Sequence, residues 1–272
     1  MIIGQEKIRS RIDSSTVDTF PRTLMLLGDY GSGKHTVVNY IASKFNLEIE
    51  DISNNLTLEY IDNINQRVSP YVYIIESNKL TIKNENVILK FLEEPLKNSF
   101  VVVLSERRHS IIPTILNRCQ IWEMESYDYT FLKSFIKDLS VDSDILLKLA
   151  NTPGKVIEYQ THPIDEMIKL AFKIFDNIEK ANIANILTLS RFIAFKNEKD
   201  RFNVDLFFDV LLFVIRDLYG QDYKCSFQAY LLTSNLNNYK YLFNVDKKAL
   251  FENYLINLKS LMGGMGRDSS RT

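Results

Sequence analysis

The sequence has few of the residues that build metal centres or disulfide frameworks. Its 272 residues include only 2 cysteines, Cys119 and Cys225, and 3 histidines, and none of them shows the spacing of a zinc site. The two cysteines lie far apart and form no C-x-x-C motif. We therefore expect no bound metal of this kind, no disulfide framework and a reducing cytoplasmic compartment.

Long apolar runs and a surplus of one charge are also missing. No apolar run reaches ~18 residues, so no transmembrane helix and no membrane partner are expected, and early charges such as Glu6 and Lys7 argue against a signal peptide. The formal net charge is −1, so nucleic-acid contacts must come from a local patch or a larger assembly. With 46% hydrophobic residues the chain can build real cores, and its length suggests two or three structural units.

One stretch carries a clear chemical signal: LMLLGDYGSGKHTVVN, residues 24–39. An apolar strand leads into a turn with Gly28, Gly31, Ser32 and Gly33, and Lys34 opens a helical pattern. Glycines let backbone N–H groups converge on an anion, and a helix N-terminus adds partial positive charge. The spacing matches the phosphate-binding P-loop, G-x-x-x-x-G-K. The alternative is a glycine turn that only joins a strand to a helix.

The motif departs from the pattern directly after the lysine. His35 stands where Ser or Thr should offer a hydroxyl to Mg²⁺, and Thr36 comes one residue late, about 100° round the helix. We therefore expect this loop to bind the phosphates of ATP or ADP, whereas Mg²⁺-dependent hydrolysis is doubtful.

The pattern around the motif predicts a doubly wound α/β sheet. Apolar residues of an opening helix over residues 2–14 are Ile2, Ile3, Ile8 and Ile12, and Leu58, Ile61 and Ile64 mark a helix over residues 57–66. Further strands are expected at residues 47–52, 71–75, 99–104 and 119–124, and further helices at residues 34–44 and 84–94. Alternating strands and helices place a ligand at the carboxyl ends of parallel strands, beside the P-loop.

Strand signals stop after Tyr127. Short helices are expected at residues 129–139, at 142–150 and from 153, followed by about five longer helices over residues 163–262. Breaks are expected near Ala181 and over residues 198–201, 220–224 and 235–239. An apolar stripe over residues 207–218 indicates a buried helix, and the tail 263–272 reads as disordered.

Three stretches resemble bacterial AAA+ clamp-loader ATPases. Residues 71–104, with the LEEP helix, resemble the family's block from Walker B to sensor 1. Residues 111–124, IIPTILNRCQIWEM, are similar to its P-x-T-I-x-S-R-C segment, with Asn117 in place of Ser, and residues 2–8 resemble its signature at the adenine pocket. The resemblance covers residues 2–124 and is closest in character to the delta-prime members of bacteria or bacteriophages. The cysteine-bearing zinc module of many bacterial members is missing.

The resemblance implies a division of the chain. A P-loop core would span residues 1–125, a small helical lid 126–162 and an all-α collar 163–262. It also implies that Arg118 contacts, in trans, the γ-phosphate of a neighbouring subunit, and that Lys155 lies near a basic sensor 2 position. A helix-end arginine in a salt bridge and a solvated surface lysine are the alternatives.

The position after the 71–75 strand is unsuited to hydrolysis. Glu76 and Ser77 stand where the family has Asp-Glu. Glu76 could in principle reach a metal ion with its longer side chain, although Asp would suit the position better, and Ser77 cannot act as a general base at neutral pH. In the sensor 1 turn, Arg107 and Arg108 could face DNA phosphates or a neighbour. Glu93 and Glu94 suit packing or an interface better than catalysis.

Two classes of function follow from the resemblance. The favoured one is a weakly catalytic or non-catalytic clamp-loader subunit of a bacterial or phage replisome, whose partners are other loader subunits, the sliding clamp and primed DNA. The main alternative is an active ATPase, either a homo-oligomeric phage loader or another replication or repair AAA+ motor. A third is an adaptor that binds no nucleotide.

Overall fold

The computed structural model describes residues 2–67, 69–80, 82–93, 99–108, 111–137, 142–196, 203–218, 225–239 and 246–265. The chain forms two compact units. The first runs through Leu132 and also takes in Thr152–Lys155, while the second holds Lys133–Asn151 and the chain from Val156 onward. The short segment Thr152–Lys155 thus returns to the first unit from within the second.

The first unit is built on a five-stranded parallel sheet in the order β2-β3-β4-β1-β5. Its strands are β1 (Thr23–Leu27), β2 (Glu48–Asp51), β3 (Tyr71–Glu76), β4 (Phe100–Ser105) and β5 (Gln120–Glu123). All five lie where the sequence predicts them. The inner strands are runs of β-branched and apolar residues because both of their faces are covered.

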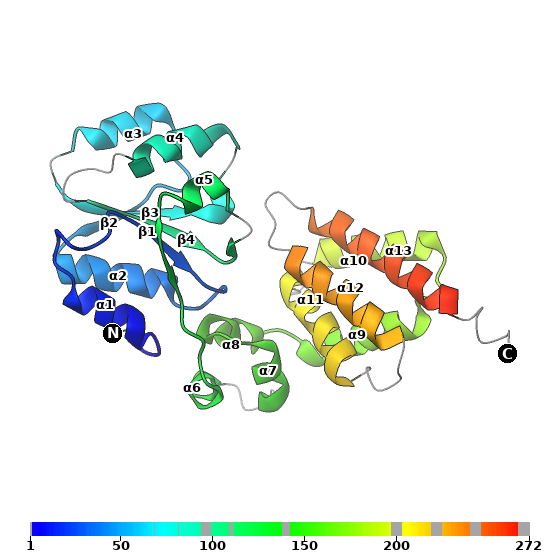
Figure 1. The fold of residues 1–272 in the computed structure, drawn as a ribbon. Coiled ribbons are helices and arrows are strands. Elements are labelled where there is room, and N and C mark those ends of the chain that lie inside the picture. The colour runs from blue at the N-terminus through cyan, green and yellow to red at the C-terminus, as the bar shows by residue number, and fades with distance from the viewer. Residues whose placement is uncertain are drawn as a thin grey trace. The chain divides into compact units, whose positions relative to one another are not determined.

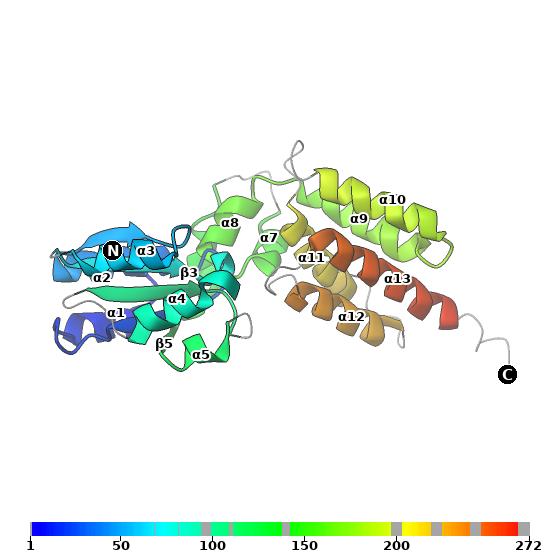
Figure 2. The same ribbon diagram turned by 90° about the horizontal axis from the view of Figure 1, so that it is seen from above.

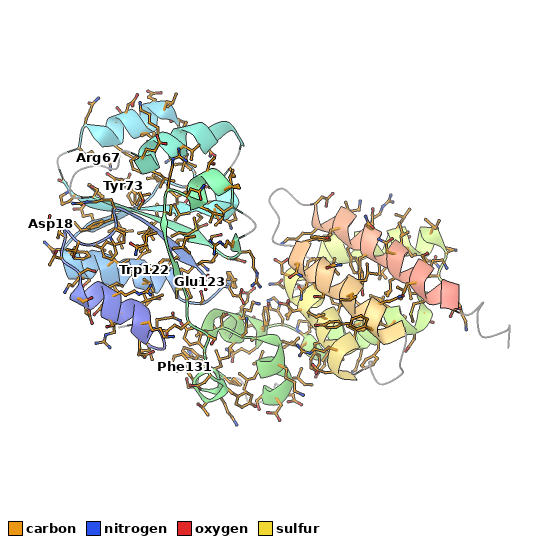
Figure 3. The ribbon with its side chains drawn as sticks, viewed as in Figure 1. Asp18, Arg67, Tyr73, Trp122, Glu123 and Phe131 are labelled. Atoms are coloured by element: carbon orange, nitrogen blue, oxygen red, sulfur yellow. The ribbon has the colours of Figure 1, made fainter. Side chains whose placement is uncertain are left out.

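Helices cover both faces of the sheet, as Figure 1 shows. Helices α1 (Glu6–Ser14) and α2 (Lys34–Phe45) lie on one face, and α3 (Leu58–Asn65), α4 (Ile82–Glu93) and α5 (Pro113–Leu116) lie on the other (Figure 1). Two short helices, η1 (Ser77–Lys79) and α6 (Tyr129–Lys133), follow β3 and β5. Alternate residues of β1 separate the two cores: Leu24 and Leu26 pack toward α1 and α2, whereas Met25 packs toward α3 and α4. Trp122 lies on the first side and Tyr73 on the second (Figure 3). The predicted doubly wound α/β fold is confirmed.

Two residues expected on apolar helix faces are exposed. Ile3 precedes α1, which begins only at Glu6, and its exposed fraction is 55%. Leu58 is the first residue of α3 and is 58% exposed, whereas Ile61 and Ile64, further along the helix, are buried. The helical period holds, but the positions of the helix ends decide which residues reach the core.

The second unit contains helices and no strand in its described part. Its helices are α7 (Ser143–Leu149), most of α8 (Pro153–Tyr159), α9 (Ile164–Asn177), α10 (Ile183–Lys196), α11 (Val204–Phe213) with the π-helical turn η3 (Val214–Leu218), α12 (Cys225–Tyr239) and α13 (Lys247–Met265). Helices α9 to α13 pack as a bundle (Figure 2). No helix in the described ranges is both long enough and apolar enough to cross a bilayer.

The bundle explains why one predicted break is wrong. Helix α12 continues through residues 235–239, because it packs between α11 and α13 and Leu236 is buried there. Tertiary packing here overrides the weak helix propensity of the asparagines. Helix α13 continues to Met265, into the segment expected to be disordered from Gly263, and residues 266–272 lie outside the described part.

The predicted apolar stripe is the centre of this bundle. On α11, Phe207 and Phe208 are fully buried, and both stack or make edge contacts with Phe251 of α13. Buried aromatic rings of this size dominate the stability of a small helical core. The bundle therefore depends on contacts between α11 and α13, which are far apart in the sequence.

A matched pair of substitutions tests this assignment. Phe207→Ala should lower the free energy of unfolding of the helical unit by ~3–5 kcal/mol, because it leaves a cavity in a dry core. Phe227→Ala, at a position that is 64% exposed on α12, should change it by less than about 0.5 kcal/mol. Chemical denaturation followed by circular dichroism measures both, and equal effects would contradict the packing described.

Candidate functional site

The site lies at the carboxyl ends of the central strands, where the glycine loop of residues 28–33 joins β1 to α2. The parallel register brings Leu27 opposite Ser105 and Glu76 opposite Leu104, so β3 and β4 end beside the loop. The N–H of Gly28 donates to the carbonyl of Ser105 at 3.0 Å. This is the edge at which open α/β sheets bind ligands.

Glycine is required at three positions of the loop. Gly31 and Gly33 have φ angles of +72° and +88°, a region that side chains rarely adopt. At Gly28 a Cβ atom would lie 2.6 Å from the side chain of Met124 and 3.0 Å from Oγ of Ser32. The predicted glycines therefore serve the loop conformation itself.

The loop offers unused hydrogen-bond donors at the start of α2. Within the described residues, the N–H groups of Gly33, Lys34, His35 and Thr36 donate no hydrogen bond, and Gly33 supplies no side-chain cap. The hydroxyl of Ser32 is buried and has no partner in the described part of the chain. Free N–H groups and the helix dipole make such a terminus an anion-binding site.

Lys34 supplies the full positive charge. Its ammonium donates to the carbonyl oxygens of Gly28 at 2.7 Å and Asp29 at 3.0 Å. Burial lowers the pKa of Lys34, against the opposing effect of Glu106, Asp29 and Glu76. A partly buried ammonium that has neutral carbonyl partners gains stabilisation from an arriving anion.

The carboxylate of Glu76, on the side where a magnesium ion would lie, is engaged by two neighbouring side chains. Nε2 of His35 lies 3.3 Å from one oxygen of Glu76, and the ammonium of Lys79 lies 3.1 Å from the other. The bond to Glu76 raises the pKa of Lys79, which keeps this ammonium charged. The hydroxyl of Ser77 is buried against that of Ser105 at 3.0 Å.

The residues present therefore fit a phosphate but not a magnesium ion. Glu76 already has both oxygens engaged, and Thr36 is exposed on the first turn of α2. Among the described residues no group of three or more His, Cys, Asp or Glu is arranged to hold a metal. Hydrolysis needs a metal ligand and a base. Of the two residues at the end of the 71–75 strand, Glu76 is engaged by His35 and Lys79, and Ser77 carries a hydroxyl, which does not act as a base at neutral pH.

Arg107 forms an ion pair with the glycine loop. Its guanidinium lies 2.8 Å from the carboxylate of Asp29, a residue of that loop. This pair neutralises an acidic side chain close to Lys34. No sequence pattern predicted this pair, because Asp29 follows β1 and Arg107 follows β4, and only the sheet brings the two strand ends together.

Three residues from after β5 complete the surroundings of the loop, and sequence reasoning missed them as site residues. Tyr127, Thr152 and Gly154 each bond a carbonyl of the loop. Lys155 lies with them: its side chain is buried, and its N–H bonds the hydroxyl of Thr152 at 3.3 Å. The NTPGK motif marked this neighbourhood, but only the fold brings it to Gly31.

Arg118 lies at the opposite end of the strands. Its carbonyl accepts a hydrogen bond from Thr23, the first residue of β1, whereas the glycine loop follows the last. Four strand residues separate these ends, roughly 13 Å. The guanidinium bonds Glu93, at 2.7 Å from Nε, and the carbonyl of Thr114 at 2.9 Å, and is about a third exposed. Arg118 therefore cannot serve the phosphate site of its own chain.

Comparison with known proteins places the central part of the chain. Residues 48–128 match the family described as "DNA polymerase III, delta subunit". The delta-prime subunit of DNA polymerase III from Haemophilus influenzae is 28% identical over 113 residues, which is 37% of this chain and 34% of that protein. The Bacillus subtilis delta-prime subunit is 26% identical over 153 residues, 54% of this chain and 46% of that protein. The chain thus matches less than half the length of either relative.

A solved structure that is similar to this chain is the RuvB Holliday junction branch migration motor of Thermotoga maritima. It has a TM-score of 0.49 and 17% identity, over 94% of this chain and 88% of that one. A similarity of this degree carries no information about what the present chain binds.

The ion pair between Arg118 and Glu93 yields a stability prediction. Because the pair is partly exposed, Arg118→Ala and Glu93→Gln should each change the free energy of unfolding by less than about 1 kcal/mol. Urea denaturation of both variants and the parent chain measures this. A loss of several kcal/mol in either would mean that the pair is structural.

Proposed function

This chain resembles the delta-prime subunit of DNA polymerase III, and we propose that it is a nucleotide-binding, weakly catalytic or non-catalytic AAA+ subunit of a sliding-clamp loader in DNA replication. It would work with other loader subunits, with the sliding clamp and with primed DNA held by the assembly. Its lid would span residues 126–162 and its collar residues 163–262.

The observation that carries the proposal is the glycine loop. Four consecutive N–H groups that donate to no described residue, the buried hydroxyl of Ser32 and the ammonium of Lys34 all belong to residues 32–36, at the start of α2. This donor set suits the β-phosphate of ADP or the β- and γ-phosphates of ATP. A loop that only connected β1 to α2 would need neither the lysine nor the buried hydroxyl.

The neighbouring carboxylate supports weak hydrolysis. Glu76 is held by His35 and by the ammonium of Lys79, and the Lys79 charge beside it disfavours a divalent ion there. Ser77 donates to Ser105 and cannot take a proton from water. When ATP is bound, the chain would hold and orient its phosphates without activating a nucleophile.

The position of Arg118 supports a role in trans. It lies at the end of the strands away from its own phosphate site, and its charge is permanent and partly exposed. Such a guanidinium can stabilise the charge that develops on a γ-phosphate bound by another subunit. The contact with Glu93 would hold the side chain until that neighbour is present.

Isothermal titration calorimetry tests nucleotide binding. ADP should bind the parent chain equally well with and without Mg²⁺, since the site offers the ion no ligand. Lys34→Ala should weaken ADP binding about 10- to 100-fold, as charge-assisted hydrogen bonds contribute ~1.5–3 kcal/mol. Lys44→Ala, at the exposed end of the same helix, is the matched control. An absence of ADP and ATP binding would leave the adaptor reading.

Single-turnover and steady-state assays with ATP should show negligible hydrolysis. A turnover of the order of 1 s⁻¹ or faster, in the ordinary range for enzymes, that is abolished by Lys34→Ala would establish the alternative, an active loader ATPase or another AAA+ motor. ATP or ADP binding that is tighter in the presence of Mg²⁺ would also support the active ATPase.

The arginine is tested in a complex with the ATPase subunit that assembles with this chain. Arg118→Ala should lower the ATPase rate of that partner by orders of magnitude, up to about 10³-fold. Glu93→Gln removes the same ion pair but keeps the guanidinium, so it should leave the partner's rate high. Equal rates for Arg118→Ala and the parent complex would remove the role in trans.

A further inference from the structure

Three consecutive carbonyl groups of the glycine loop are bound by residues from outside it. The first is that of Tyr30, which accepts a hydrogen bond from Oγ1 of Thr152 at 2.7 Å. Thr152 is buried, and the same hydroxyl accepts from the N–H of Lys155, so it also caps the start of α8. One hydroxyl thus ties the beginning of α8 to the loop.

The second carbonyl, that of Gly31, accepts from the N–H of Gly154 at 3.0 Å. The two backbones touch: a Cβ atom on Gly154 would lie 2.4 Å from Cα of Gly31, and one on Gly31 would lie 2.6 Å from Cα of Gly154. Only a pair of glycines allows this approach. It also gives a partner to one of the N–H groups that a helix start leaves unpaired.

The third carbonyl, that of Ser32, accepts from the hydroxyl of Tyr127 at 2.8 Å. Tyr127 is held by a parallel ring stack with Phe131 and by close packing against Gly4, where a Cβ atom would lie 2.6 Å from the ring. Burial raises the pKa of Tyr127, so its hydroxyl keeps its proton and remains a donor. The third contact is therefore as firmly placed as the other two.

These contacts orient the peptide groups of the loop. In a trans peptide the C=O and N–H bonds point in opposite directions. Holding the carbonyls of Tyr30, Gly31 and Ser32 therefore turns the N–H groups of the next residues away from Thr152, Gly154 and Tyr127. The Ser32 N–H closes the turn on Asp29 at 3.2 Å, and the Gly33 N–H joins the free donors at the start of α2.

We infer that Tyr127, Thr152 and Gly154 are positioning residues that hold the loop in its phosphate-binding conformation before any nucleotide arrives. The inference rests on the proposed binding of nucleotide. It assigns the role to residues that contact the loop carbonyls and not the phosphates. Preorganised donors bind more tightly because the loop loses less conformational freedom on binding.

The test compares two substitutions at one position. Thr152→Val removes the hydroxyl at nearly constant shape, and Thr152→Ser keeps it. Thr152→Val should weaken ADP binding about fivefold, the effect of one neutral hydrogen bond, while Thr152→Ser should stay close to the parent chain. Tyr127→Phe should act like Thr152→Val. Gly154→Ala should weaken binding most, because its Cβ atom meets Gly31.

A second measurement needs no nucleotide. Hydrogen exchange at the Ser32 amide reports on the turn closed by Asp29, and it should be faster in Thr152→Val than in Thr152→Ser. Equal exchange in the two variants, or altered exchange with unchanged ADP affinity, would overturn the inference and leave the proposed function intact. A parent chain that binds no ADP would overturn the proposed function, and equal Ser32 exchange would then overturn the anchoring as well.

Discussion

The structure depends on how the chain turns from β1 into α2 and leaves the N–H groups of residues 33–36 without a backbone partner among the described residues. Parallel strands place this turn between the ends of β4 and β5, and two glycines with positive φ angles let it reverse tightly. The result is a row of N–H groups that no backbone carbonyl of the described residues accepts. A row of unpaired N–H donors next to the partly buried ammonium of Lys34 favours the binding of an anion.

The same edge of the sheet explains why binding and hydrolysis can be separated. Phosphate binding uses main-chain groups, which substitutions hardly alter, together with Lys34. Hydrolysis uses side chains at the ends of β3 and α2, and here these are His35, Glu76 and Ser77, which bond one another or their neighbours. A chain of this kind can lose hydrolysis while it keeps its fold and its ability to bind phosphate.

Arg118 and the glycine loop lie at opposite ends of one short strand. The strand therefore separates the proposed nucleotide site from the arginine proposed to act on a neighbouring subunit. Lys34 and the loop act on a ligand of this chain. Arg118 is bound by Glu93 and lies at the end of the strands away from the loop. The proposed role of Arg118 in a neighbouring subunit rests on this separation.

Local pattern alone determined the five strands, the helices between them and the glycine loop, because apolar runs, period and glycine spacing act over a few residues. It also identified Lys34, and it showed that His35 replaces the Ser or Thr of the P-loop pattern. Only the tertiary structure decided the pairs Arg107 with Asp29, Arg118 with Glu93, and Glu76 with His35 and Lys79, and the three anchors of the loop. Those contacts join residues up to about 120 positions apart, whose meeting depends on strand order and on where helices end. The spacing of residues along a sequence does not specify the strand order or the positions of the helix ends.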